Sequence, residues 1–229
     1  MDGPQARELL QRARLMLLFT PELCGGRPPL EVLEAALPEV DLVQVRVKPP
    51  GRPGAPSPGR EVYEWTAAVL ALVAERPGLD VPVLVNDRVD VAGALAGRGC
   101  AGVHVGDGDL PASEARALLG GEAVIGLSTH GPRDVAAAAE LPVDYLGFGP
   151  VHATATKGYG RGLGAEAAWV AQAGTGLPLF PIGGIAPENA AELAPVGRAA
   201  VSAAVLGAPD PAAAARALRG LLAASDRAD

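Results

Sequence analysis

Eight short apolar segments alternate with eight helix-like segments along this chain, and no other feature constrains its fold as strongly. The apolar segments are residues 15–19, 42–45, 81–85, 102–105, 123–127, 143–148, 177–182 and 199–203. Each is rich in Val, Leu and Ile with little polar alternation, which is typical of strands buried on both faces of a parallel sheet.

The helix-like segments are residues 29–37, 60–75, 87–97, 111–119, 132–140, 165–173, 187–194 and 211–223. Eight right-handed βα units in succession close into a (β/α)8 TIM barrel, so we predict an α/β chain with a single barrel domain. An open doubly wound sheet is the alternative, but it gives no reason for eight repeats.

The barrel is expected over residues 15–223. Residues 1–14 precede the first strand and are predicted to form an additional helix, and residues 224–229 form a C-terminal tail. Residues 49–59 follow the second strand as a Pro/Gly-rich loop.

Composition excludes several functional classes. The chain has 19 Lys+Arg and 26 Asp+Glu, a formal net charge of −7, which argues against nucleic acid or an anionic membrane as the main partner. Its two cysteines, Cys24 and Cys100, offer neither a disulfide framework nor a zinc cluster. The apolar run 15–19 is too short for a membrane span or signal peptide. A cytoplasmic protein is expected, and no sequence feature points to a particular oligomeric state.

Residues with distinctive chemistry cluster after the predicted strands. Both lysines, Lys48 and Lys157, and all three histidines lie near the ends of predicted strands or in the segments that follow them. In a TIM barrel the active site is built at the carboxyl ends of the strands, so we expect these residues at one end of the barrel.

Arg46 and Lys48 lie two residues apart after the second strand, so their side chains point to the same side. Two converging cations suit a phosphate or diphosphate. The alternative is a salt bridge at the end of the barrel.

Asp87 and Asp109 follow adjacent strands, which in a sheet lie about 4.8 Å apart. Two carboxylates there can share Mg²⁺ that is completed by water and substrate phosphate. The alternative is that each aspartate caps a helix, and Asp107 is a second candidate ligand in place of Asp109.

Two further segments are typical of anion binding. Thr154 and Thr156 precede Lys157 and a Gly-rich stretch, which suits a carboxylate or phosphate and a mobile lid. Gly183-Gly184 after the seventh strand matches the usual backbone phosphate site of barrels, or else a tight turn. His130 is either an acid/base residue or structural. The residues alone thus indicate an enzyme that acts on phosphorylated small molecules. It would either join two such compounds or isomerise one.

Taken together and in order, the motifs of the chain resemble those of a known family. The ordered motifs QVRVK, VNDRVD, GVHVGDGDLP, IGLSTH, GPVHATATK, IGGI and VSAAVLGAPDP are similar to those of the thiamine-phosphate synthases, whose superfamily includes the thiazole tautomerases. The resemblance implies a TIM barrel that transfers an aminopyrimidine-methyl group from its diphosphate to a thiazole phosphate.

The resemblance also implies roles for individual residues. Asp87 and Asp109 would bind Mg²⁺, and Lys157, Arg46, Lys48 and Ser128 would be the catalytic set. The pyrimidine diphosphate would be held by Gln44, Arg46, Lys48, Asn86, Ser128 and Lys157. The thiazole phosphate would be held by Thr154, Ala155, Thr156, Gly184, Ser202 and Ala203.

Some positions depart from the family pattern. Val47 stands where Glu is usual, Asp107-Gly108 where Gln-Glu is usual, and Ala203 where Ser is frequent. These departures bear on substrate affinity more than on reaction type. Two rival functions are a thiazole tautomerase that uses His130 and a non-catalytic member that binds a thiamine precursor. The presence of Lys48, Asp87, Asp109 and Lys157 argues against both.

Overall fold

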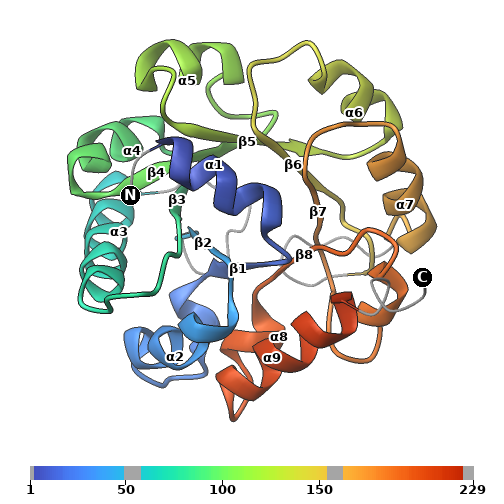
Figure 1. Ribbon diagram of the computed structural model, residues 1–229. Helices are drawn as coiled ribbons and strands as arrows, with labels where there is room; N and C mark the ends of the chain where they lie inside the picture. Colours follow the sequence, from blue (N-terminus) through green and yellow to red (C-terminus); the bar gives the residue numbers. More distant parts are fainter. Residues whose placement is uncertain (1–2, 49–57, 154–161, 224–229) are drawn as a thin grey trace.

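The computed structural model describes residues 3–48, 58–153 and 162–223, and within them eight parallel strands form one sheet (Figure 1). The strand order is β7-β6-β5-β4-β3-β2-β1-β8, and a parallel bridge between Ile182 and Ala200 links the two end strands. The predicted (β/α)8 barrel is therefore confirmed. Its strands are β1 (Leu15–Phe19), β2 (Leu42–Val45), β3 (Val83–Asn86), β4 (Cys100–Val105), β5 (Val124–Thr129), β6 (Tyr145–Phe148), β7 (Leu179–Pro181) and β8 (Ala199–Val201).

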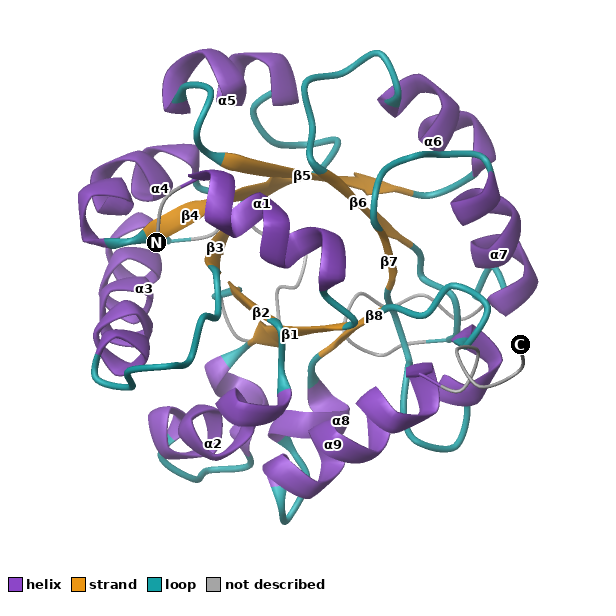
Figure 2. Ribbon diagram, in the orientation of Figure 1, coloured by secondary structure: helices purple, strands orange, loops and turns teal. Residues whose placement is uncertain are grey.

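Helices surround the strands as an outer ring (Figure 2). They are α2 (Pro29–Ala36), α3 (Gly59–Ala74), α4 (Val89–Leu95), α5 (Ala112–Leu119), α6 (Pro132–Ala138), α7 (Ala165–Ala173), α8 (Ala203–Leu206) and α9 (Pro211–Leu222). Most of the core lies between this ring and the strands, and its side chains are mainly Val, Leu and Ala.

The prediction of a helix over residues 187–194 is wrong. Only a 3-10 turn, η5 (Ala190–Leu193), follows β7. The Asn189 side chain accepts the N–H of Ala186 and donates to the carbonyl of Gly184, so it holds a turn in place of the first helical turn. The strand expected over 199–203 is also too long, since β8 ends at Val201 and the short helix α8 begins at Ala203.

The helix expected from residue 87 begins later. Asp87 has a φ of +66°, the left-handed region, and among the described residues it is the one non-glycine with positive φ. Such a residue cannot begin a right-handed helix, so α4 starts at Val89.

Helix α1 (Gly3–Arg12) crosses the end of the barrel where the strands begin (Figure 1). Its buried Ala6 and Leu10 pack against a second apolar cluster inside the barrel that includes Met16 and Tyr145. At its C-terminal end, Arg198 donates to the carbonyls of Leu10, Gln11 and Ala13. The helix therefore covers this end of the barrel.

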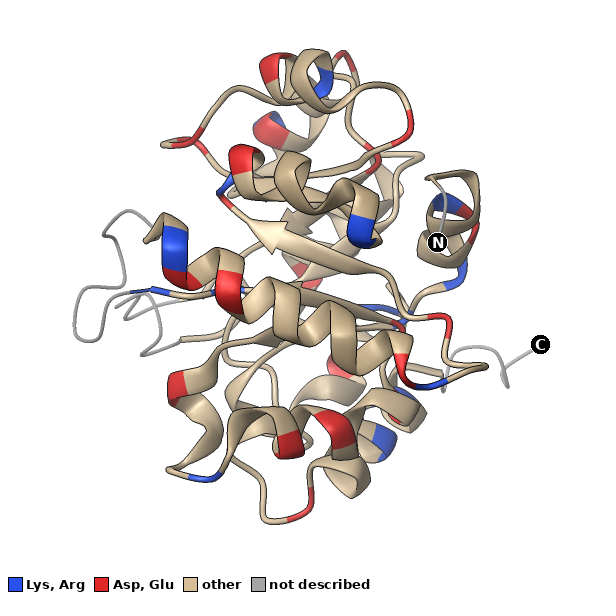
Figure 3. Ribbon diagram, turned by 90° about the vertical axis from the view of Figure 1, so that its left-hand side faces the viewer, with Lys and Arg blue, Asp and Glu red and all other residues tan. Residues whose placement is uncertain are grey.

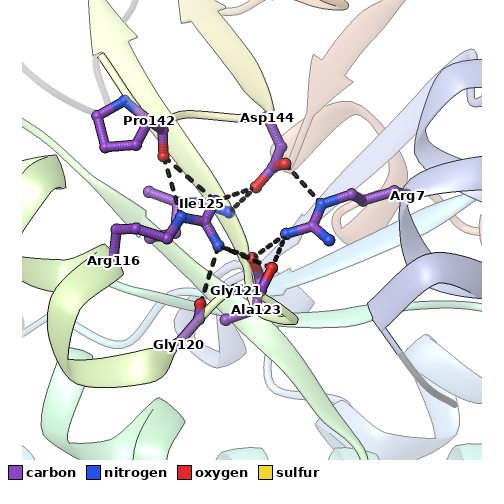
Figure 4. A network of polar contacts seen from close by, with 8 residues as sticks. All are labelled: Arg7, Arg116, Gly120, Gly121, Ala123, Ile125, Pro142 and Asp144. Carbon is purple, nitrogen blue, oxygen red and sulfur yellow. Dashed lines mark hydrogen bonds and ion pairs between the residues drawn. The ribbon is translucent and has the colours of Figure 1, made fainter.

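An ion-pair network also holds α1 in place through Arg7, near the middle of the helix (Figure 4). Asp144 accepts from Arg7 Nε and from Arg116 Nη2, each at 2.7 Å, and also from the backbone N–H of Ile125. The Asp144 side chain is only 14% exposed, so little water competes for these contacts.

We expect Asp144→Ala to lower the free energy of unfolding by about 3 kcal/mol, because it removes the carboxylate that neutralises two partly buried guanidinium groups. The matched control is Glu8→Ala, which breaks the exposed Arg12–Glu8 pair and should cost ~0.5 kcal/mol or less. Urea denaturation measures both values. Equal losses in the two variants would contradict the role assigned to Asp144.

In the side view, acidic and basic residues are interspersed over the outer helices (Figure 3). Across residues 3–48, 58–153 and 162–223, none of the helices combines the length and apolarity needed to cross a membrane.

Candidate active site

The predicted site residues that the structure describes gather where the strands end. Arg46 and Lys48 follow β2, Asn86 ends β3, and Ser128 lies near the end of β5. Parallel strands of a closed barrel all end on one rim, so residues far apart in sequence meet there. Residues 154–157, and with them the expected roles of Thr154, Ala155, Thr156 and Lys157, lie outside the described residues, as do residues 49–57 and 224–229.

A carboxylate pair forms one side of this rim. The pKa of the Asp109 carboxyl is raised because burial disfavours its charged form, and the nearby Asp87 carboxylate raises it further, whereas the hydrogen bond from Gly106 N–H opposes the rise. Arg88 and Pro111 occupy the N-cap positions of α4 and α5, so neither aspartate is a helix N-cap. The interpretation of these residues as helix caps is therefore wrong.

Asp87, one member of the carboxylate pair, has a left-handed backbone conformation. Its N–H donates to the carbonyl of His104 on the adjacent strand, and Lys48 Nζ lies 2.5 Å from its Oδ2. Non-glycine residues in this conformation are strained and concentrate at functional sites. The salt bridge considered for Lys48 is thus present, and it joins the cation to the carboxylate pair.

Mg²⁺ fits this donor set. No group of three or more potential ligands among His, Cys, Asp and Glu exists within the described ranges. Mg²⁺ is commonly held by one or two carboxylates together with water and substrate phosphates, so Asp87 and Asp109 are the residues that would hold it here.

Arg46 supplies buried positive charge beside the carboxylates. Arg46 is only 5% exposed, and its Nη2 has no hydrogen-bond partner among the described residues. Burial lowers the pKa of Arg46, and Asp87 partly offsets that effect. A buried donor without a partner is costly, and an anion that accepted from Nη2 would offset this cost.

A cavity of about 150 Å³ opens beside Arg46 inside the barrel. Its wall includes apolar side chains such as Leu18 and Phe180 and the polar Gln44, Asn86 and Ser128. Such a mixture suits a flat heteroaromatic ring held by a few polar contacts. His130 also lines the cavity, with Nδ1 2.7 Å from the carbonyl oxygen of Gly149.

Gly184, Ser202 and Ala203 also line the cavity. Gly184 has a φ of +62°, and a Cβ there would lie 2.5 Å from the carbonyl oxygen of Ala153, so only glycine fits. The Ser202 hydroxyl donates to the carbonyl of Leu18, and Ser202 and Ala203 both line the cavity. The first N–H groups of a helix lack intrahelical partners, so the start of α8 suits a phosphate contact.

Sequence reasoning missed three residues. His104 and Tyr145 lie inside the barrel between Gln44 and Ser128. Asn189 holds the Gly184 turn. The scarcity of asparagine and the placement of His104 on a strand were the available signals, but neither specified a partner.

Comparison with known proteins identifies the family. A family model described as thiamine monophosphate synthase matches residues 15–206. The chain belongs to this family. Two relatives named thiamine-phosphate synthase, from Moorella thermoacetica and Azorhizobium caulinodans, are 40% and 37% identical to it. The alignments cover 90% and 93% of this chain and 93% and 96% of those proteins.

Solved structures agree with membership of the thiamine monophosphate synthase family. The thiamine phosphate pyrophosphorylase from Pyrococcus furiosus superposes with a TM-score of 0.76 at 29% identity, over 94% of this chain and 96% of that one. A 3-hexulose-6-phosphate synthase superposes at 0.63 with 19% identity over 92% and 100% of the two chains, which shows the barrel fold alone.

Proposed function

We propose that this chain is a transferase that joins 4-amino-2-methyl-5-(diphosphooxymethyl)pyrimidine to a thiazole phosphate, giving thiamine phosphate and diphosphate. The observation that carries the proposal is Arg46, buried and incompletely paired, beside Lys48 and the Asp87/Asp109 carboxylates. Cations and a carboxylate pair that could hold a divalent metal, next to a cavity, suit a substrate with a diphosphate on a heteroaromatic ring.

The proposed reaction breaks the bond between the methylene carbon and the diphosphate oxygen, and forms a bond from that carbon to the thiazole nitrogen. The leaving diphosphate keeps the electron pair of the broken bond, and the nitrogen lone pair makes the new one. The electron-rich aminopyrimidine ring spreads the positive charge that develops on the methylene carbon. No protein acid or base is required, so positioning and electrostatic stabilisation supply the rate.

In this proposal Arg46 and Lys48 bind the diphosphate, and Gln44, Asn86 and Ser128 hold the pyrimidine end of the substrate. Asp87 and Asp109 would hold Mg²⁺, which neutralises developing charge on the leaving diphosphate when bound. Main-chain groups of Gly184, Ser202 and Ala203 bind the thiazole phosphate. The roles of Thr154, Ala155, Thr156 and Lys157, and the cytoplasmic location, are carried into the proposal from the sequence.

The test is an assay of the purified protein with both substrates, in which thiamine phosphate and diphosphate are measured with Mg²⁺ or with excess chelator. We expect equal amounts of the two products with Mg²⁺ and neither with chelator. Full activity in chelator would contradict the metal assignment. Isomerisation of the thiazole phosphate alone, without coupling, would instead indicate a tautomerase, and binding without any turnover a silent family member.

A further inference from the structure

Three buried side chains inside the barrel form a hydrogen-bonded chain that ends at Ser128. Gln44 Nε2 lies 3.4 Å from Tyr145 Oη, Tyr145 Oη lies 2.9 Å from His104 Nδ1, and His104 Nε2 lies 2.9 Å from Ser128 Oγ. Gln44, His104 and Tyr145 are 3%, 8% and 0% exposed, whereas Ser128 is half-buried at the cavity. The chain thus runs from the barrel interior to the cavity wall.

Two glycines make room for the rings of this chain. A Cβ on Gly126 would lie 2.1 Å from Tyr145 Cζ, and a Cβ on Gly147 would lie 3.1 Å from His104 Cε1. Tyr145 also meets Phe180 edge to face at 5.7 Å between ring centroids. The rings are therefore held by shape as well as by hydrogen bonds.

The direction of each hydrogen bond follows from the donor inventory. Gln44 Nε2 also faces Met16 Sδ at 3.7 Å, and a thioether sulfur accepts but does not donate, so this edge of the amide is the NH2 group. The Tyr145 oxygen then accepts from Gln44, and its single proton is directed to His104 Nδ1. Burial raises the pKa of Tyr145, so the hydroxyl keeps this proton.

We infer that Tyr145 holds His104 as the neutral Nε2–H tautomer, so that His104 donates to Ser128 Oγ and turns the Ser128 hydroxyl proton toward the cavity. Ser128 would then meet the substrate as a donor, which matches an anionic or lone-pair acceptor. His104 and Tyr145 are positioning residues in this scheme, because they act through Ser128. The functional part of this inference rests on the proposed synthase reaction.

The tautomer is tested without any reaction. The protein has three histidines, so ¹⁵N NMR of histidine-labelled protein at neutral pH resolves few ring signals, and loss of one set in His104→Gln assigns His104. We expect an unprotonated Nδ1 and a protonated Nε2 in the wild type, and a mixture of tautomers in Tyr145→Phe. An Nδ1–H tautomer or a doubly protonated ring in the wild type would overturn the inference, whatever reaction the protein catalyses.

The action through Ser128 is tested by a double-mutant cycle. Tyr145→Phe keeps the ring and should lower kcat about tenfold, near the upper end of what one neutral hydrogen bond contributes. In a Ser128→Ala background the same change should cost less than about twofold, because the group it orients is already gone. Equal losses in both backgrounds would show a merely structural role and overturn the inference.

The matched control is Tyr63→Phe, which removes a hydroxyl from a residue 39% exposed on the outer helix α3. It should leave kcat, KM and the histidine signals unchanged. If neither the wild type nor any variant turns over the two substrates, the proposed function fails. The NMR measurement still decides the tautomer of His104.

Discussion

Asp87→Asn is expected to lower the rate of thiamine phosphate formation by about 10³-fold, the size of effect seen when a main electrostatic stabiliser is removed. Asparagine has nearly the shape of aspartate and tolerates the left-handed backbone that residue 87 adopts, so the substitution removes charge without adding strain. The variant would lose one carboxylate of the proposed metal pair and an ion-pair partner of Lys48. The loss should appear mainly in kcat, because the leaving group is most negative in the transition state.

Asp90→Asn is the matched control for this change. Asp90 lies three residues further along, its side chain is 64% exposed, and it pairs with Arg88 on the surface. Steady-state kinetics at several Mg²⁺ concentrations should show an unchanged enzyme for Asp90→Asn. If Asp87→Asn retained wild-type kcat at saturating Mg²⁺, the carboxylate would have no part in the reaction as proposed.

The sequence was sufficient to predict the barrel, because its two signals, the apolar strands and their regular spacing, can both be recognised along the chain. Segments such as 15–19 and 42–45 are apolar enough to be buried on both faces, and they recur at spacings that leave room for one helix each. The regions that failed are those where a side chain overrides local preference. Asn189 replaces the expected helix after β7 with a turn, and Asp87 delays α4 by adopting a left-handed backbone.

The described part of the site was predictable to the extent that barrel geometry alone decides it. Arg46, Asp87 and Ser128 each lie at or just after the end of a strand, so their common location follows from the fold. The proximity of Asp87 to Asp109 was predictable because both follow adjacent strands. Other contacts between side chains on different strands are not encoded locally. The His104–Tyr145 pair leaves no spacing signature, because strand register and the space left by Gly126 decide it.

Arg46→Met is expected to change activity and stability in opposite directions. A guanidinium buried with an unpaired Nη2 destabilises the ligand-free protein, because desolvating the charge is incompletely offset by Asp87. Methionine fills similar space without a charge, so the free energy of unfolding should rise by about 1 kcal/mol. The same change removes a charged hydrogen-bond donor from the proposed diphosphate site, so kcat/KM for the pyrimidine substrate should fall about 100-fold.

Arg60→Met is the matched control, since the Arg60 side chain is 90% exposed on α3. It should change neither quantity. Urea denaturation with and without inorganic diphosphate and Mg²⁺ separates the two effects: the ligand should stabilise the wild type and Arg60→Met but not Arg46→Met. A loss of stability in ligand-free Arg46→Met would mean that the guanidinium is a structural group already satisfied by its surroundings. Retained stabilisation by diphosphate would place the anion away from Arg46. A gain in stability together with a loss of diphosphate binding is the result expected of a guanidinium that is buried to meet an anion.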